Sequence, residues 1–415
     1  SYITIDGLNF TDPTMSSSDK TTNANMGAAI YFSYYGNVTA NYEIVRNSDF
    51  SKIGLGIVLN GNNGLIENNT FTDLKNLVNT CSGAWGTCPA GSISGGAYED
   101  YGANGITLDG NDHTIQYNYF SGNWAASYDF GWNGGAIEAY SAGTLNRMKV
   151  LYNTFVDNGG IIEYGSGNNA SINDNLFAYN LAINNGDIAW TQYSTQFTTQ
   201  ASNIQFFNNT IIENSNSRFS KGANQCAGIP VGNGYPTCMY GGMLFAYGST
   251  PPSSITTVYN LKNNVYDVST QFRVKGSGSD DKFIHENNVY KLSGGATQGF
   301  GSLNASEKTT SAAVVNSSAG AVPTATSYTT QPQTNFALTA TSIAINAGTN
   351  VGFTTDLAGA AINGAPDAGT YEYASGTPTD TTAPTVAFSS PAAGATVSGT
   401  TTVSATASDN VGVAS

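Results

Sequence analysis

Charged residues are scarce in this sequence. Asp, Glu, Lys and Arg make up 10% of its 415 residues, and 14 of them are Lys or Arg, so the net charge at pH 7 is -14. Binding to nucleic acid or to an anionic membrane surface requires clusters of basic residues, which are missing here. Apolar runs are also too short for a transmembrane helix. We therefore expect no nucleic-acid partner and no membrane insertion.

Cysteine and histidine are rare as well. The four cysteines form two local pairs, Cys81 with Cys88 and Cys226 with Cys238, and neither pair has zinc-finger spacing. We expect two short disulfide-closed loops in an oxidising compartment; two free thiol pairs are the alternative. Of the two histidines, His113 is expected in a surface turn and His285 in a structural position. A G-x-S-x-G nucleophile motif does not occur.

Glycine and asparagine are abundant, and they recur in a pattern. Asparagine followed by an apolar residue repeats about every 21 to 24 residues where no insert intervenes. A Gly-rich unit with an apolar centre precedes most copies, as in "GLGIVLN", "GGAIEAY" and "GGIIEYG". Segments this short, between turn residues, predict brief strands rather than helices. A period slightly above 20 predicts a solenoid, in which stacked coils bury one continuous core.

The repeats predict two internal columns. Side-chain amides at a turn can satisfy backbone groups of neighbouring coils, so we expect an asparagine ladder. Its expected members are Asn69, Asn118, Asn153, Asn175, Asn209, Asn264 and Asn288. A stack of Phe71, Phe120, Phe155 and Phe177 is expected beside it. The pattern resembles the right-handed parallel β-helix of the pectate-lyase-like superfamily over residues 1–300, which implies an all-β solenoid with loop inserts.

The C-terminal part carries a second resemblance. "SIAINAGTNVGFTTDLAGAAINGAPDAGTYEY" (342–373) is similar to the closing segment of secreted bacterial β-helix proteins. "ASGTPTDTTAPT" then reads as a linker, and the residues after it resemble the first strands of a bacterial immunoglobulin-like domain. We predict a β-helix domain over 1–374 with its closing segment at 335–374, a linker at 375–384 and an incomplete β-sandwich at 385–415. The resemblance implies a secreted, extracellular protein, either released or attached to a cell surface.

Two glutamates stand out in the Gly-rich units. Aligning the apolar centres puts Ile137 and Ile162 in one inward column together with Ile188 and Leu244. The next residue in each coil must then face outward, which places Glu138 and Glu163 side by side, about 4.8 Å apart at the backbone. The same alignment puts Asp109 and Asp187 on the flanking coils, and Asp129 lies shortly before Glu138. A carboxylate cluster of Glu138, Glu163, Asp187, Asp109 and Asp129 is the candidate catalytic site.

Carboxylates on adjacent strands, such as those of Glu138 and Glu163, repel each other and destabilise the fold unless another group offsets the repulsion. A shared proton would raise one pKa and leave one acid and one base, as glycosidic bond cleavage requires. A bound Ca²⁺ would serve as well, although none is required. Lys149 and Arg147 on the following strand would give a purely structural pairing.

Aromatic residues near the glutamates suggest a sugar partner, because rings offer flat apolar platforms for pyranose faces. The candidate substrate-binding residues are Trp132, Tyr140, Trp124, Tyr247, Phe245 and Arg273. Inserts at 75–103 and 213–240 could wall a groove.

Three functions remain open. We favour a monomeric glycoside hydrolase acting on a polysaccharide. A calcium-assisted polysaccharide lyase, with Lys149, Arg147, Arg218 or Lys221 as base, is the second candidate, and a non-catalytic glycan-binding adhesin is the third.

Overall fold

The structure is a computed structural model that describes residues 2–11, 28–32, 40–74, 80–81, 93–94, 103–127, 131–139, 143–164, 171–191, 200–214, 217, 219, 245–247, 251–268, 274–275, 282–294, 302–316, 322–328, 335–373, 385–392 and 394–408. The chain divides into two compact units, residues 1–373 and 374–415.

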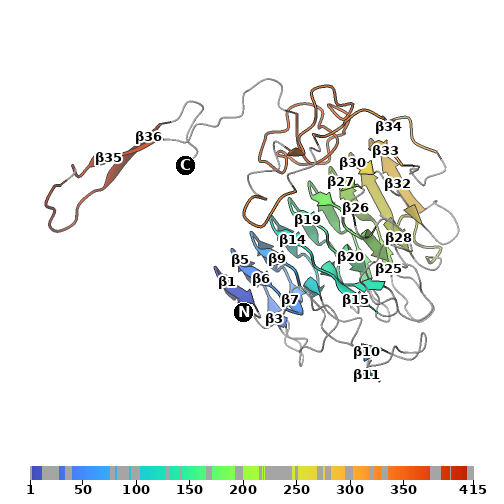
Figure 1. Ribbon diagram of the computed structural model, residues 1–415, viewed down its shortest axis with the longest axis horizontal. Helices are drawn as coiled ribbons and strands as arrows, with labels where there is room; N and C mark the ends of the chain where they lie inside the picture. Colours follow the sequence, from blue (N-terminus) through green and yellow to red (C-terminus); the bar gives the residue numbers. More distant parts are fainter. Residues whose placement is uncertain are drawn as a thin grey trace. The chain divides into compact units, whose positions relative to one another are not determined.

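Three long parallel sheets build the first unit, and successive coils contribute strands to these sheets in turn. Figure 1 shows the strands stacked in chain order from blue to yellow. The sheets are here named A, B and C. Sheet A contains β1 (Thr4–Asp6), β5 (Ile44–Arg46), β8 (Leu65–Glu67), β13 (Thr114–Gln116), β18 (Lys149–Leu151), β22 (Leu176–Ala178), β26 (Ile204–Phe207), β29 (Tyr259–Lys262) and β32 (Phe283–Glu286). Sheet B contains β2 (Asn9–Thr11), β6 (Asp49–Ser51), β9 (Thr70–Thr72), β14 (Tyr119–Ser121), β19 (Thr154–Val156), β23 (Leu181–Ile183), β27 (Thr210–Glu213), β30 (Val265–Val268), β33 (Val289–Leu292) and β34 (Lys308–Thr309).

Sheet C carries the candidate site. It contains β3 (Ala28–Phe32), β7 (Leu55–Asn62), β12 (Asn104–Asp109), β17 (Gly135–Glu138), β20 (Gly160–Tyr164), β24 (Asp187–Thr191), β28 (Phe245–Tyr247) and β31 (Val274–Lys275), with β4 (Ala40–Asn41) beside β7. Small pairs form between β10 (Thr80–Cys81) and β11 (Ile93–Ser94), between β15 (Ala125–Ser127) and β16 (Gly131–Asn133), and between β21 (Ser171–Asn173) and β25 (Gln200–Ser202). The chain is thus an all-β parallel β-helix, as the repeats predict.

An asparagine ladder fixes the corner between sheets A and B. Each ladder side chain donates to a backbone carbonyl of the preceding coil at 2.8–3.0 Å. Each also donates to the Oδ1 of the next ladder residue at 3.0–3.1 Å, except the last, Asn288, which donates to Glu307 Oε1 at 3.0 Å. The residue before each member is left-handed, with φ between 53° and 58°. The members are Asn69, Asn118, Asn153, Asn180, Asn209, Asn264 and Asn288. Buried amides are thereby satisfied along the rod.

One predicted ladder member and one predicted stack member are wrong. Asn180 takes the place expected for Asn175, whose Oδ1 instead accepts from the Met148 amide at 2.9 Å in another corner. Phe177 accordingly lies in sheet A, paired with Val150, and Ala182 follows Phe155 in sheet B. The segments "NLF" (175–177) and "NLA" (180–182) both begin with Asn, one residue and an apolar residue. The spacing of the repeats alone therefore predicts the wrong sheet for Phe177 and the wrong corner for Asn175.

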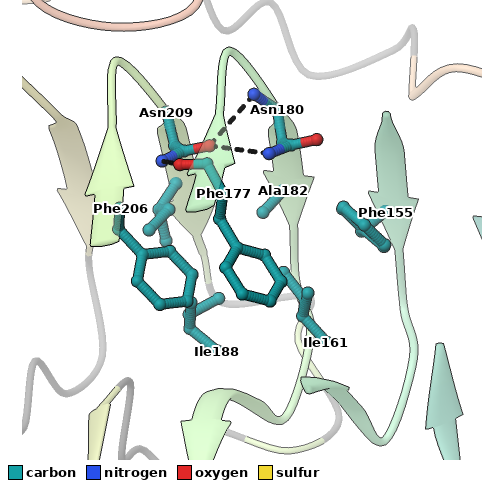
Figure 2. Close-up of a pocket in the computed structure, with 9 residues that line it drawn as sticks. Phe155, Ile161, Phe177, Asn180, Ala182, Ile188, Phe206 and Asn209 are labelled. Carbon is teal, nitrogen blue, oxygen red and sulfur yellow. Dashed lines mark hydrogen bonds between the residues drawn. The ribbon is translucent and has the colours of Figure 1, made fainter. Parts of the chain in front are cut away.

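The phenylalanine stack therefore ends at Phe155. Phe10, Phe50, Phe71, Phe120 and Phe155 stack with centroids 4.7–5.0 Å apart. Beyond them, an apolar cavity opens where Ala182 replaces a ring, and Phe177 and Phe206 of sheet A point toward it together with Ile161 and Ile188 (Figure 2). This cavity belongs to the core and holds no titratable side chain.

The closing segment covers the outer face of sheet B. Outward residues of sheet B, among them Leu181, Ile183 and Val265, form a second apolar cluster with Val314, Val315, Phe336, Leu338, Ala344, Ala347, Ala368 and Tyr371. Thr370 pins the segment, because its Oγ1 donates to the Asn180 carbonyl at 2.7 Å and accepts from the Thr210 amide at 2.7 Å. In Figure 1 this segment is the orange coil beside β27 and β30.

The second unit contains two antiparallel strands, β35 (Thr385–Ser390) and β36 (Ser404–Ser408). Antiparallel pairing there contrasts with the parallel sheets of the first unit and fits the start of an immunoglobulin-like domain. None of the described residues form a helix long and apolar enough to cross a membrane.

Candidate functional site

The candidate site is a set of carboxylates on the outer face of sheet C. Glu138 on β17 and Glu163 on β20 are direct register partners on adjacent strands, as expected from the sequence. Adjacent parallel strands lie about 4.8 Å apart. The outward column continues from Thr107 through both glutamates to Trp190. Each of these four side chains is partly exposed.

A second column explains why glycine stands at position 135. In this column Asn104 pairs with Gly135, and Gly160 pairs with Asp187. A Cβ on Gly135 would lie 2.6 Å from the Gly160 carbonyl oxygen, so a side chain does not fit there. Asn158, in the second copy of the motif, belongs to an inner ladder, donating to Asn185 Oδ1 at 2.8 Å. The two copies therefore differ: Asn158 supplies an inner amide, whereas Asn133 of the first copy pairs with Ala125 in the β15–β16 hairpin, and Gly135 allows the close backbone approach.

The two glutamates have different partners. The side-chain amide of Asn104 on β12 donates a hydrogen bond to Oε2 of Glu138. A donor of this kind favours the ionised form of a carboxylate. Asn104 itself is buried, so its amide is held in place by the coil. Glu138 is thus placed to act as an anion.

Glu163 has the opposite environment. Burial raises the pKa of Glu163 from its ordinary value to about 7. Asp187, on the next coil, has a pKa well above its ordinary range because of burial first, and then because of the negative charges of Glu163 and Glu213. Oδ1 of Asp187 is buried without a hydrogen-bond partner. Glu163 is therefore a carboxyl group that gains and loses its proton near neutral pH.

The alignment of the later coils is wrong by one residue. Ile162 pairs with Ala189, and Ala189 pairs with Phe245, so the inward column does not pass through Ile188. Phe245 is consequently fully buried in the core rather than available to a substrate. The same shift makes Tyr247 pair with Thr191, which is itself buried, and not with the outward column.

Correcting this shift reveals Trp190. It pairs with Glu163 on the outward column, where the apolar-centre alignment had placed Ala189. Aligning on Asn-Gly instead would have found it, because "NGGIIE" (158–163) and "NGDIAW" (185–190) match residue for residue.

Asn104 and Glu213 were also missed; an Asn-Gly pair before Ile106 was the available signal for Asn104.

Two further candidates have structural contacts. Asp109 pairs with Asn60, two residues beyond the column of Glu138, and its Oδ1 accepts from the Thr144 amide at 3.0 Å. Trp124 is 8% exposed and packs edge-on against Phe219, with centroids 6.0 Å apart. Trp124 is therefore not an open platform for a sugar ring.

Several predicted residues are not located. Asp129, Tyr140, Arg273, Cys88, Cys226, Cys238, Arg218 and Lys221 lie outside the described residues. Trp132 pairs with Ala126 in the β15–β16 hairpin just before β17, and Cys81 ends β10. The substrate-binding roles of Trp132, Tyr140 and Arg273, and both disulfides, stay predictions.

The basic residues proposed for other roles stand elsewhere. Arg147 forms a two-point contact with Asp112 at 2.7 Å, and Lys149 begins β18 of sheet A. Neither compensates Glu138 or Glu163. In the described part of the chain, no group of three or more His, Cys, Asp or Glu side chains has the geometry of a metal site; calcium stays a prediction.

His113 is buried, contrary to the expected surface turn. Its Nδ1 accepts from the Gly64 amide at 3.1 Å, and its Nε2 lies 3.2 Å from the Asp109 carbonyl oxygen. Burial lowers the pKa of His113. His285 lies 2.6 Å from Glu307 at the far end of the solenoid. Both histidines are structural.

The arrangement of Glu138, Glu163 and Asp187 can perform acid–base chemistry. One carboxyl group has its pKa raised to about 7, and its neighbour accepts a hydrogen bond from a side-chain amide. A proton donor beside a carboxylate on an outward surface suits a reaction that protonates a leaving group while a base or nucleophile acts nearby.

Comparison with known proteins gives limited matches. Residues 384–415 match a family model described as bacterial Ig domain. No curated protein sequence matches the chain. Among solved structures, the tailspike protein of E. coli bacteriophage HK620 with a pentasaccharide matches with 11% identity and a TM-score of 0.20, over 65% of this chain and 54% of that one. A double mutant of that tailspike, also with a pentasaccharide, matches with 11% identity and a TM-score of 0.23, over 74% of this chain and 58% of that one.

This chain thus spans little more than half the length of either structure. With TM-scores this low, neither match carries an inference about the site.

Proposed function

We propose that this chain is an extracellular glycoside hydrolase that cleaves a polysaccharide on the outer face of sheet C. The observation that carries the proposal is the register pairing of Glu138 with Glu163, one hydrogen-bonded by an amide and the other with its pKa raised to about 7. Glu163 protonates the departing glycosidic oxygen. Glu138 acts as the anionic base or nucleophile.

Asp187 lies on the strand next to Glu163. Burial and then the charges of Glu163 and Glu213 raise the pKa of Asp187, since nearby carboxylates repel each other when they are ionised. Low overall charge, the two cysteine pairs and the immunoglobulin-like segment favour an extracellular location. The lyase alternative is less favoured, because neither of the strands that carry the glutamates, β17 and β20, contains a basic residue.

The test is a cleavage assay with the full chain on a broad panel of glycans, read by new reducing ends and by ultraviolet absorbance. Glu163→Gln and Glu138→Gln should each lower the rate about 100-fold or more, because each removes a proton-transfer group while keeping shape. Glu67→Gln is the matched control: Glu67 accepts from Gln116 on sheet A, and the amide can keep that contact.

Each alternative has its own result. Ultraviolet-absorbing products would indicate a lyase. Binding without any cleavage by the unaltered chain would indicate the adhesin. Full activity in both glutamate variants would move the reaction away from sheet C.

A further inference from the structure

We infer that Gly160 and Asp187 form a subsite for one sugar unit, whose ring fills the open space above Gly160 and whose hydroxyl donates a hydrogen bond to Oδ1 of Asp187. The inference rests on the proposed function in that it names how the same site recognises its ligand. Two features of sheet C carry it. One is a glycine that the fold does not require, and the other is a buried carboxylate oxygen without a hydrogen-bond partner among the described residues.

Four outward positions on β20 and β24 form a small rectangle beside Glu138. Gly160 pairs with Asp187, and Glu163 pairs with Trp190. Adjacent strands lie about 4.8 Å apart and three residues of a strand span about 10 Å, an area that suits one sugar ring. On each strand the two intervening residues are buried in the core, where two of them line the core cavity (Figure 2); they are Ile161, Ile162, Ile188 and Ala189.

The hydrogen bond to Glu138 shows that residues three apart share this outer face. Asn104 occupies the position of Gly160 two strands earlier, and its side-chain amide donates to Oε2 of Glu138, which occupies the position of Glu163 one strand earlier. The space above Gly160 therefore adjoins the carboxyl group of Glu163.

Gly160 leaves one corner of the rectangle without a side chain. A Cβ there would have the Asp187 carbonyl oxygen as its nearest described neighbour, at 3.6 Å, which is an ordinary van der Waals distance. Its φ is not left-handed either. A Cβ on Gly135, by contrast, would lie 2.6 Å from the Gly160 carbonyl oxygen.

Glycine inside a strand often marks the close approach of another backbone or of a ligand. The first reason accounts for Gly135. It does not account for Gly160, which is partly exposed. The second reason applies there, and the missing side chain keeps room for a ligand beside Glu163.

Asp187 supplies the polar side of the subsite. Its Oδ1 is buried and has no hydrogen-bond partner among the described residues, which is an unfavourable state for an acceptor. A sugar hydroxyl is a donor that fits this oxygen in either protonation state, because a protonated carboxyl group keeps an acceptor oxygen. The charge of Glu163 contributes to the raised pKa of Asp187, so one sugar can contact both groups.

The open space is tested by Gly160→Ala in the full-length Glu138→Gln background, which keeps all four positions of the rectangle. The probes are hexasaccharides of cellulose, xylan, mannan, β-1,3-glucan, chitin, polygalacturonate and alginate, and the tightest is titrated by calorimetry. We expect at least ~10-fold weaker binding in Gly160→Ala, because the methyl group takes the place of the ring.

Stability separates this role from a structural one. The urea midpoint of Gly160→Ala should stay the same or rise, because alanine fits the backbone and restricts the unfolded chain. Gly135→Ala is the matched control, and its midpoint should fall because its Cβ meets a backbone oxygen.

The hydroxyl contact is tested by Asp187→Ala and Asp187→Asn in the same background. Asparagine keeps an acceptor oxygen and alanine does not, so we expect about 10-fold weaker binding in Asp187→Ala and most of the affinity in Asp187→Asn. Both variants remove the charge, so a purely electrostatic role would affect them equally. Among monodeoxy forms of the bound hexasaccharide, one should bind weakly to the background protein and lose nothing further in Asp187→Ala.

Unchanged affinity in Gly160→Ala, a fall in its urea midpoint, equal affinities of the two Asp187 variants, or no bound hexasaccharide would overturn the subsite. Binding that follows the expectations without cleavage by the unaltered chain would refute the hydrolase and leave the subsite standing. Cleavage by the unaltered chain, with unchanged affinity in Gly160→Ala and Asp187→Ala, would do the reverse.

Discussion

The outer faces of sheets B and C are built from the same coils but have opposite chemistry. On sheet B the outward residues are mainly aliphatic, and the closing segment buries them. On sheet C the middle of the outward column consists of Thr107, Glu138, Glu163 and Trp190, and these side chains are partly exposed. Backbone geometry is shared, so the outward side chains decide which face is packed and which face is presented to a ligand.

An acidic residue placed on the buried outer face of sheet B should give the largest effect on stability. Leu181→Glu places an unpaired carboxylate beneath the closing segment, where Leu181 is fully buried. We expect a loss of about 4 kcal/mol or more, measured by urea denaturation. The mirror change, Glu163→Leu on sheet C, should cost little or stabilise. Similar losses from both changes would contradict the contrast between the faces.

The pH dependence of stability sharpens the comparison at a single residue. Burial raises the pKa of Glu163 to about 7, so the folded state binds a proton that the unfolded chain releases near pH 4.3. Stability contributed by this proton is present below about pH 4.3 and is lost as the pH rises through 7. Glu163→Gln should therefore be more stable than the parent at pH 8, by up to about 3 kcal/mol, and about equal at pH 4.

Thermal unfolding at several pH values measures this difference. A constant offset between the two proteins from pH 4 to pH 8 would show that Glu163 ionises normally. Under the proposed function, the stabilised variant is also the inactive one, a trade between stability and activity.

The hydrogen bond to Glu138 can be removed separately. Asn104→Ala deletes the amide that donates to Glu138, which should cost about 1 kcal/mol of stability, measured by urea denaturation, and lower the cleavage rate by a modest factor because Glu138 is less firmly positioned. Unchanged stability and an unchanged rate would mean that this hydrogen bond does not position Glu138.

The smallest expected effect lies in the core beneath both faces. Ala182→Val fills part of the cavity beside Phe155 (Figure 2) and should stabilise by about 0.5–1 kcal/mol. Ala201→Val, at a fully buried position of the short β25 strand, is the control and should destabilise. Loss of stability in Ala182→Val would mean that the cavity cannot accept added methyl groups.

The fold and the central pair could be predicted from the sequence because both depend on period and register. Asn-x-apolar repeats located six of the seven ladder members, and the Gly-rich units placed Glu138 beside Glu163. Asn175 was misassigned because sheets A and B share the same local pattern. Phe245 and Tyr247 were misplaced because a one-residue slip exchanges inward and outward positions.

The protonation states could not be predicted in the same way. The raised pKa of Glu163 depends on how much of the side chain the surrounding coils cover, and the hydrogen bond to Glu138 depends on Asn104, 34 residues earlier. These contacts come from stacking, which the local sequence does not encode.

The ladder corner has a constant length throughout the solenoid. From β5 to β33, two residues separate each strand of sheet A from the following strand of sheet B, whereas the segments before and after the strands of sheet C vary widely in length. An extra residue at this corner would interrupt the row of hydrogen bonds between buried asparagine amides. Extra residues in the segments beside sheet C leave the asparagine ladder intact. The solenoid therefore tolerates insertions best in the segments beside sheet C, which carries Glu138 and Glu163. Proteins that evolve from this chain could acquire new ligand preferences by changing those segments while the solenoid stays the same.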